Sequence, residues 1–163
     1  MRALPQVRLR PVQLPEDIEV AYPWYQEPVV LDGAEGPNAA PFTRERIARM
    51  YQYLASIGRV YIIEVREGES YTPVGDVALS ERMIPIVIGD ARWRGRGVGT
   101  AALQEVLELA RRLGFSRLTA HRIFLGNQAS ERLFARVGFR RDRTGVDDEG
   151  HGYGVWVLDL RDP

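Results

Sequence analysis

The sequence predicts an α+β protein of about seven strands flanked by about four helices. Strand-like segments in hairpin order occupy the first half of the 163-residue chain, and a strand–helix–strand crossover follows in the second half. A glycine-rich stretch, 94–99, joins the strand of that crossover to its helix. Alternating and 3.6-periodic apolar patterns in this order are typical of a sheet with helices packed on it.

Composition restricts the classes of protein to which the chain can belong. The length and the 45% hydrophobic content fit a single globular domain, 1–163. The 22 basic and 22 acidic residues cancel, which argues against a general nucleic-acid-binding surface. Cysteine is absent, so disulfides, thiol catalysis and thiolate metal sites are excluded.

The apolar runs are short and none approaches the ~18 residues of a membrane span. The first five residues also lack the apolar segment of a signal peptide. We therefore expect a cytoplasmic protein without a membrane partner.

The first half of the chain begins with a short strand at 7–9 and a brief helix at 15–22. Four prolines within 23–41 predict a long surface loop, and loops of that length are uncommon without a role. Thr43 is a candidate N-cap for a helix that ends at Gly58. Its apolar stripe, which should pack on the sheet, is formed by Ile47, Met50, Tyr51, Leu54 and Ile57. Strands are then predicted at 60–65, 74–79 and 83–88, with a turn at 67–73.

The second half begins with an amphipathic helix over 98–113 that Gly114 caps. A strand at 118–123 follows, and Asn127 caps a short helix that runs to 137. The last two strands are predicted at 139–143 and 153–160, around a flexible connection at 144–152.

The glycine-rich stretch has the chemistry of a phosphate cradle. Small residues let backbone N–H groups approach an anion, and a helix N-terminus adds unpaired donors and partial positive charge. Two arginines, Arg94 and Arg96, can clamp phosphate oxygens from the same loop.

Two motifs resemble those of the GNAT superfamily of N-acetyltransferases. Arg94, Gly97 and Gly99 match the Arg/Gln-x-x-Gly-x-Gly/Ala pyrophosphate loop. Residues 127–139 resemble the family's Asn-x-x-Ser/Ala…Leu-Tyr/Phe-x-x-x-Gly-Phe segment, as in ribosomal-protein alanine or aminoglycoside-type acetyltransferases. The resemblance implies a mixed, mostly antiparallel seven-stranded sheet in which two strands splay apart. It also implies that acetyl-coenzyme A lies in the gap as a co-substrate.

The resemblance assigns coenzyme-binding roles to three parts of the chain. Backbone groups before the loop would orient pantetheine, and Asn127 would contact it, although an N-cap looks identical in sequence. The implied residues are Val87, Ile88, Gly89, Arg94, Gly95, Arg96, Gly97, Val98, Gly99, Thr100 and Asn127.

Phe134 stands where the family usually has a tyrosine acid, so the resemblance does not supply the catalytic acid. Ser130, one helical turn earlier, is the nearest hydroxyl, and the alternative is that no protein acid is used. Glu81 and Asp76 compete as the base. Glu81 can equally be a solvated turn carboxylate. Asp76 lies inside a strand-like run, where a charged side chain is unusual and indicates a functional role.

The acceptor end is predicted to combine aromatic residues with carboxylates, as a cationic amine requires. The candidate residues are Trp24, Tyr25, Glu35 and Tyr153. His121 fits a core or surface histidine better than a base. No metal site can be assembled from His121 and His151, which lie far apart without paired carboxylates at ligand spacing.

The predicted function is direct acetyl transfer from acetyl-coenzyme A to a primary amine in a ternary complex. A protein N-terminus, a polyamine and an aminoglycoside all remain open as acceptors, and a homodimer is open as well. One alternative is a non-catalytic coenzyme A sensor. A dinucleotide-binding oxidoreductase is disfavoured because Gly95-x-Gly97-x-x-Thr100 lacks the third small residue of that fingerprint.

Overall fold

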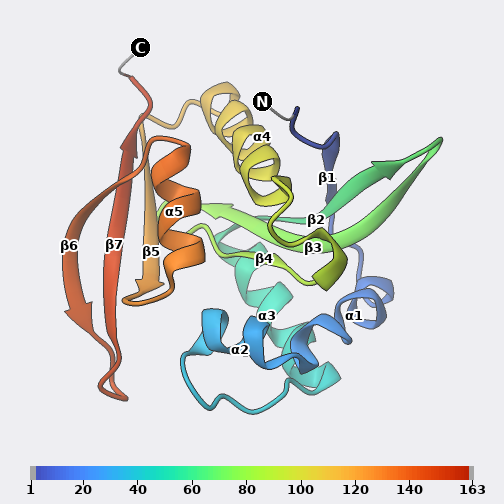
Figure 1. The fold of residues 1–163 in the computed structure, drawn as a ribbon, viewed down its shortest axis with the longest axis horizontal. Helices are drawn as coiled ribbons and strands as arrows, with labels where there is room; N and C mark the ends of the chain where they lie inside the picture. The colour runs from blue at the N-terminus through green and yellow to red at the C-terminus, as the bar shows by residue number, and fades with distance from the viewer. Residues whose placement is uncertain (1–2, 162–163) are drawn as a thin grey trace.

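The computed structural model describes residues 3–161 and shows two antiparallel sheets with helices packed around them (Figure 1). The first sheet has the order β1-β2-β3-β4 and the second the order β5-β7-β6. The strands are β1 (Val7–Pro11), β2 (Gly58–Glu67), β3 (Ser70–Ser80), β4 (Ile86–Ile88), β5 (Arg117–Phe124), β6 (Arg140–Val146) and β7 (Gly152–Asp159). The predicted α+β class is confirmed, and the strands divide between two sheets.

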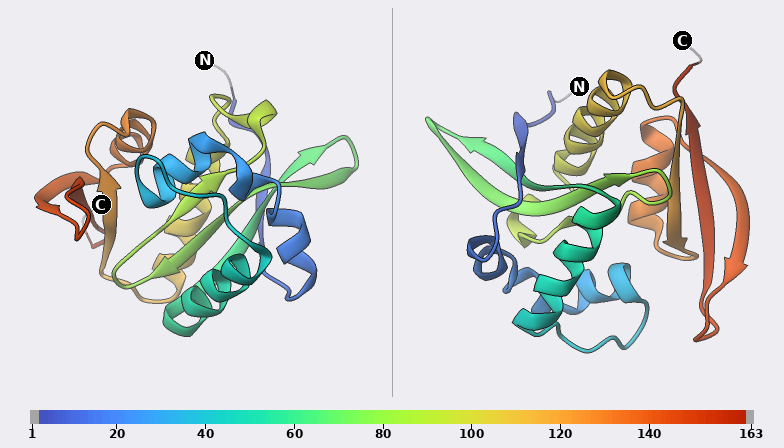
Figure 2. Two further views of the ribbon diagram at one scale, coloured as in Figure 1. Left: turned by 90° about the horizontal axis from the view of Figure 1, so that it is seen from below. Right: turned by 180° about the vertical axis from the view of Figure 1, so that it is seen from behind.

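Helices lie on both faces of the first sheet, with α3 on one side and α4 on the other (Figure 2). The α-helices are α1 (Glu16–Ala21), α2 (Pro28–Glu35), α3 (Arg44–Ile57), α4 (Val98–Arg112) and α5 (Gln128–Arg136), and the 3₁₀ helices are η1 (Trp24–Gln26) and η2 (Ala91–Trp93). Within residues 3–161, no helix is long and apolar enough to cross a lipid bilayer.

The predicted loop over 23–41 is wrong, because η1 and α2 occupy most of it. Pro28 stands in the first turn of α2, where a missing N–H costs no helical hydrogen bond. Gly36 then ends the helix with a φ of 97°. Pro28 therefore marks the start of a helix, and the longest stretch of the predicted loop without helix or strand follows Gly36.

The predicted turn over 67–73 is also too long, because β3 begins at Ser70. The register between β2 and β3 shifts at Ile63 and Glu64, which face Gly75 and Pro73 and leave Val74 unmatched. This bulge accommodates a proline inside the strand. Conversely, β4 is shorter than the predicted 83–88 because the hydroxyl of Ser80 holds Met83 in a turn.

The connection between the last two strands is shorter than the predicted 144–152. β6 continues to Val146 and β7 begins at Gly152, so only five residues join them. The turn is closed by the Asp147 carboxylate, which accepts the N–H groups of Glu149 and His151 at 3.0 and 2.8 Å. An aspartate at this place in a turn is a common way to satisfy backbone donors.

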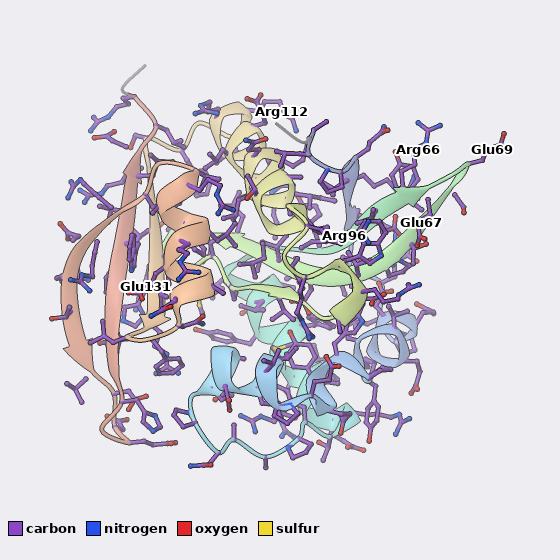
Figure 3. All side chains as sticks on the ribbon, in the orientation of Figure 1. Arg66, Glu67, Glu69, Arg96, Arg112 and Glu131 are labelled. Carbon is purple, nitrogen blue, oxygen red and sulfur yellow. The ribbon has the colours of Figure 1, made fainter. Side chains whose placement is uncertain are left out.

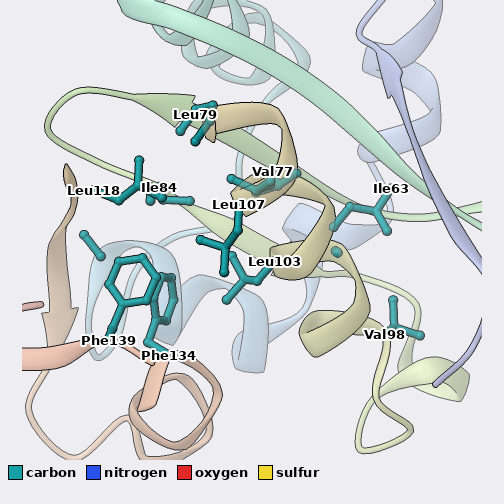
Figure 4. Close-up of a cluster of buried hydrophobic side chains, with 14 of the residues drawn as sticks. Ile63, Val77, Leu79, Ile84, Val98, Leu103, Leu107, Leu118, Phe134 and Phe139 are labelled. Carbon is teal, nitrogen blue, oxygen red and sulfur yellow. The ribbon is translucent and has the colours of Figure 1, made fainter. Parts of the chain in front are cut away.

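The main core lies between α4 and the facing sides of both sheets (Figure 4). The apolar face of α4 contributes fully buried side chains such as Leu103 and Val106. Phe134 and Phe139 meet edge to face with ring centroids 5.1 Å apart, which joins α5 to this core. The core thereby fixes the start of α4 relative to α5.

We expect Leu103→Ala to lower the free energy of unfolding by about 2–5 kcal/mol, because Leu103 has no exposed surface and its removal leaves a cavity. Urea unfolding measures the change. Val29→Ala is the control, since Val29 is 62% exposed, and should change stability by less than about 0.5 kcal/mol. Equal losses in the two variants would contradict the described core.

Candidate active site

A cleft separates the two sheets because β4 and β5 do not pair with each other within the described chain. At one end β5 approaches the turn between β3 and β4, where the N–H of His121 donates to the carbonyl of Arg82 at 3.1 Å. Beyond this contact lies a cavity of about 750 Å³, bounded by β4, β5, α5, the start of α4 and the segment from η1 to α3. This volume suits a cofactor-sized ligand.

The glycine loop lies at one end of the cavity and exposes backbone donors. Gly95 and Gly97 adopt φ values of 70° and 89°, a left-handed conformation that favours glycine. Gly97 is the N-cap of α4 and supplies no side-chain acceptor, so the first N–H groups of α4 remain available to an anion. Gly99 leaves room for α5, because a Cβ there would lie 3.0 Å from Leu133 Cδ2.

Arg94, although in the loop, is already engaged by protein groups. Its guanidinium donates to the carbonyls of Ile88 and Gly89 at 2.9 and 3.0 Å and forms an ion pair with Glu27 at the start of α2. Arg96 is exposed on the loop ahead of α4, with its guanidinium carbon 4.4 Å from the ring centroid of Trp93 (Figure 3). Contact of either arginine with phosphate stays a prediction, and for Arg94 it requires the Glu27 pair to open.

The predicted pantetheine-binding residues take up different positions. Val87 and Ile88 line the cavity from β4, whose far edge is free of strand partners within residues 3–161. Gly89 is covered by Trp24, whose Cγ would lie 2.1 Å from an added Cβ. Trp24 is therefore a packing residue. Asn127 faces the cavity and its Oδ1 accepts the Ser130 N–H at 3.2 Å, so it caps α5 as well.

Asp76 is buried in the wall of the same cavity, opposite Val87 in the β3–β4 register. The hydroxyls of Tyr25 and Tyr51 donate to its Oδ2 at 2.8 and 2.6 Å, and no hydrogen bond to Oδ1 occurs within residues 3–161. Asp76 is 6% exposed, and burial raises the pKa of its carboxyl to about 6, against the opposing effect of the two hydrogen bonds. Burial also raises the pKa of both tyrosines, which stay protonated donors.

The other catalytic candidates are placed less favourably. Glu81 is exposed in the turn between β3 and β4 and does not line the cavity. Ser130 lines it from the first turn of α5, whereas Phe134 is 2% exposed and packs into the core. His121 also lines the cavity, and burial, followed by the charges of Arg122 and Arg143, lowers its pKa.

Of the remaining acceptor candidates, Glu35 reaches the cavity and Tyr153 does not. Glu35 pairs with Arg46 across 3.3 Å. Tyr153 packs edge-on against His121 with ring centroids 5.0 Å apart, which places it behind the cavity wall.

Sequence reasoning missed three residues of the site: Tyr51, which holds Asp76, and Arg132 and Arg136, which line the cavity. Tyr51 was assigned only to the apolar stripe of its helix, and its hydroxyl gave no separate signal. Arg132 and Arg136 line the cavity from α5, and Arg136 donates to Thr100 in the first turn of α4 at 3.3 Å. Their spacing of four residues places both on one face of the helix, which was the available signal.

Comparisons with known proteins agree with this geometry. Residues 6–140 match the model of the acetyltransferase (GNAT) domain. A domain from Methanocaldococcus jannaschii is 22% identical with a TM-score of 0.80, covering 95% of this chain and 99% of that one. Spermidine N-acetyltransferase from Vibrio cholerae, in complex with coenzyme A and spermine, is 13% identical with a TM-score of 0.77 and 96% coverage of both chains. An aminoglycoside acetyltransferase in complex with coenzyme A is 17% identical, also with a TM-score of 0.77 and 96% coverage of both. No curated protein matches the sequence.

The chain belongs to the GNAT acetyltransferase family. Membership in this family makes the chain an acetyltransferase, and acetyl-coenzyme A stays its predicted co-substrate. The cleft fits this co-substrate, since left-handed glycines and an uncapped helix start expose donors at one end and a free strand edge leads inward. Family membership also excludes the alternative of a dinucleotide-binding oxidoreductase.

We expect Gly97→Val to weaken coenzyme A binding at least tenfold. The branched side chain is strained at a φ of 89°, and its Cβ would lie 3.0 Å from Leu4 Cδ2 and 3.3 Å from Pro5 Cδ, so the loop that carries the backbone donors must shift. Gly114→Val is the matched control, because Gly114 has a φ of 86° at the opposite end of α4, away from the cavity. Calorimetry compares the two affinities. Equal affinities in two folded variants would show that the loop does not hold the coenzyme.

Proposed function

We propose that the protein transfers an acetyl group to a primary amine by direct attack while both substrates are bound. One observation carries this proposal: the free oxygen of a buried carboxylate and the glycine loop belong to the same cavity. A donor that enters over the loop and an amine that reaches Asp76 would therefore meet inside a single site. Holding two reactants in this way removes much of the entropic cost of their encounter.

The donor end would use backbone donors of residues 95–100, supported by the positive charge of Arg96, Arg132 and Arg136. Acetyl-coenzyme A supplies a thioester, whose carbon–sulfur bond breaks as the carbon–nitrogen bond forms. The ammonium loses one proton to the base before attack, and the second proton, lost as the amide forms, ends on the departing sulfur. The exposed edge of β4 would hold the pantetheine arm at Val87 and Ile88, one strand away from Asp76. Asn127 can contact the same arm while it caps α5.

Asp76 would bind the acceptor ammonium through Oδ1 and accept its proton. A carboxylate is a weak base for an ammonium in water, but burial raises the pKa of the Asp76 carboxyl and so makes it a stronger base. The two tyrosines orient the carboxylate and keep Oδ2 occupied. His121 is the second candidate base, because it is held neutral in the same cavity.

For the leaving thiolate, Ser130 is the hydroxyl that faces the cavity from α5. Phe134 cannot donate a proton, and its ring is committed to the core. A thiolate of ordinary pKa leaves without full protonation near neutral pH, so Ser130 would contribute less than an essential acid does.

We expect Asp76→Asn to lower kcat/KM at least a hundredfold at pH 7.5, which is within the usual range for a general base. In the wild type, kcat/KM should fall as the pH drops through about 6, because the protonated carboxyl neither accepts a proton nor attracts an ammonium. Thiol release from acetyl-coenzyme A gives both profiles. Glu81→Gln is the control and should behave as wild type, since Glu81 is exposed outside the cavity. A fully active Asp76→Asn variant would exclude Asp76 as the general base and leave His121 as the candidate.

A further inference from the structure

We infer that the acceptor is a small monoamine whose single ammonium group is attached to an apolar chain or ring. The inference rests on the proposed acetyl transfer and narrows its acceptor. It excludes polycationic acceptors such as spermidine and aminoglycosides, after which two of the similar structures are named.

The first argument is charge. Among the described residues that line the cavity, only Glu35 and Asp76 carry carboxylates. Glu35 is already paired with Arg46 across 3.3 Å. One unpaired carboxylate, Asp76, therefore remains for an ammonium, whereas a polyamine or an aminoglycoside carries several.

The second argument is the wall beside Asp76, formed by α2, α3, the segment between these helices, β2 and the turn before β4. Its side chains are apolar: Val30, Phe42, Met50, Leu54, Val60 and Met83. Val29 and Tyr53, which are 62% and 58% exposed, extend the apolar surface to the rim. An apolar substituent gains from burial here, whereas a second ammonium would lose hydration without a partner.

The third argument is the position of α2, which bridges the cleft. A Cβ on Gly33 would lie 3.4 Å from Asn127 Nδ2, and one on Gly36 would lie 2.9 Å from His151 Nδ1. Glu27 at the other end of α2 is paired with Arg94. A small amine fits beneath this bridge, whereas the N-terminus of a folded protein would have to displace it.

The experiment compares hexylamine with 1,6-diaminohexane, which have the same carbon chain and differ by one ammonium. We expect kcat/KM for hexylamine to be at least tenfold higher, after correction for the two equivalent amines of the diamine. Met50→Glu places a carboxylate in the apolar wall and should narrow this ratio at least threefold. Met50→Gln has the same size without charge and should keep it. If Met50→Glu does not fold, the wild-type ratio alone decides.

The outcomes separate this inference from the function on which it rests. Equal or better turnover of 1,6-diaminohexane, spermidine or kanamycin would overturn the monoamine assignment and leave acetyl transfer standing. Preference for the N-terminus of an alanine peptide would overturn the small-molecule assignment. Tight binding of coenzyme A with no turnover of any amine would overturn both proposals.

Discussion

The hydrogen bonds of Tyr25 and Tyr51 to one oxygen of Asp76 determine where the N-terminal helices sit on the first sheet. The tyrosines come from η1 and α3, and the carboxylate comes from β3, so a single buried group joins three elements. A buried carboxylate is stable only when it is hydrogen-bonded or protonated, and here both tendencies operate together. Because α2 lies between η1 and α3 in the chain, the same interaction also fixes the helix that bridges the cleft.

Three consecutive residues of β3 connect this acceptor end to the donor end. The carbonyl of Val74, freed by the bulge, accepts the N–H groups of Gly89 and Asp90 at 2.8 and 3.0 Å and so holds the end of β4. Gly75 allows the two strands to approach, since a Cβ there would lie 2.0 Å from the Val87 carbonyl oxygen. Asp76 then faces the cavity. β3 thus holds both the end of β4 that leads into the glycine loop and the Asp76 carboxylate in fixed positions. A two-substrate reaction requires such an arrangement.

Much of this architecture could be predicted from the sequence, and the failures have identifiable physical causes. Amphipathic periodicity located α3 and α4, and the Thr43 cap is confirmed by its acceptance of the Arg46 N–H at 3.1 Å. Prolines misled the prediction where Pro28 starts a helix and where Pro73 lies in a bulged strand, because tertiary context decides between these uses and a loop. Phosphate-loop residues were recognisable as a local motif. The Tyr51–Asp76 pair was not, since a 25-residue separation between two hydrogen-bonding partners leaves no local pattern.

The pKa of Asp76 tests the central claim most directly, and a titration of its side-chain carboxyl by ¹³C NMR measures it, with Asp76→Asn providing the assignment. Burial against two tyrosine hydroxyls predicts a midpoint of about 6 in the free enzyme. Such a shift means that the folded protein binds this proton more tightly than the unfolded chain does. The contribution of Asp76 to the free energy of unfolding therefore declines as the pH rises from about 4 to about 6. A midpoint near the ordinary 3.8 would instead describe a hydrated carboxylate and would contradict the buried site.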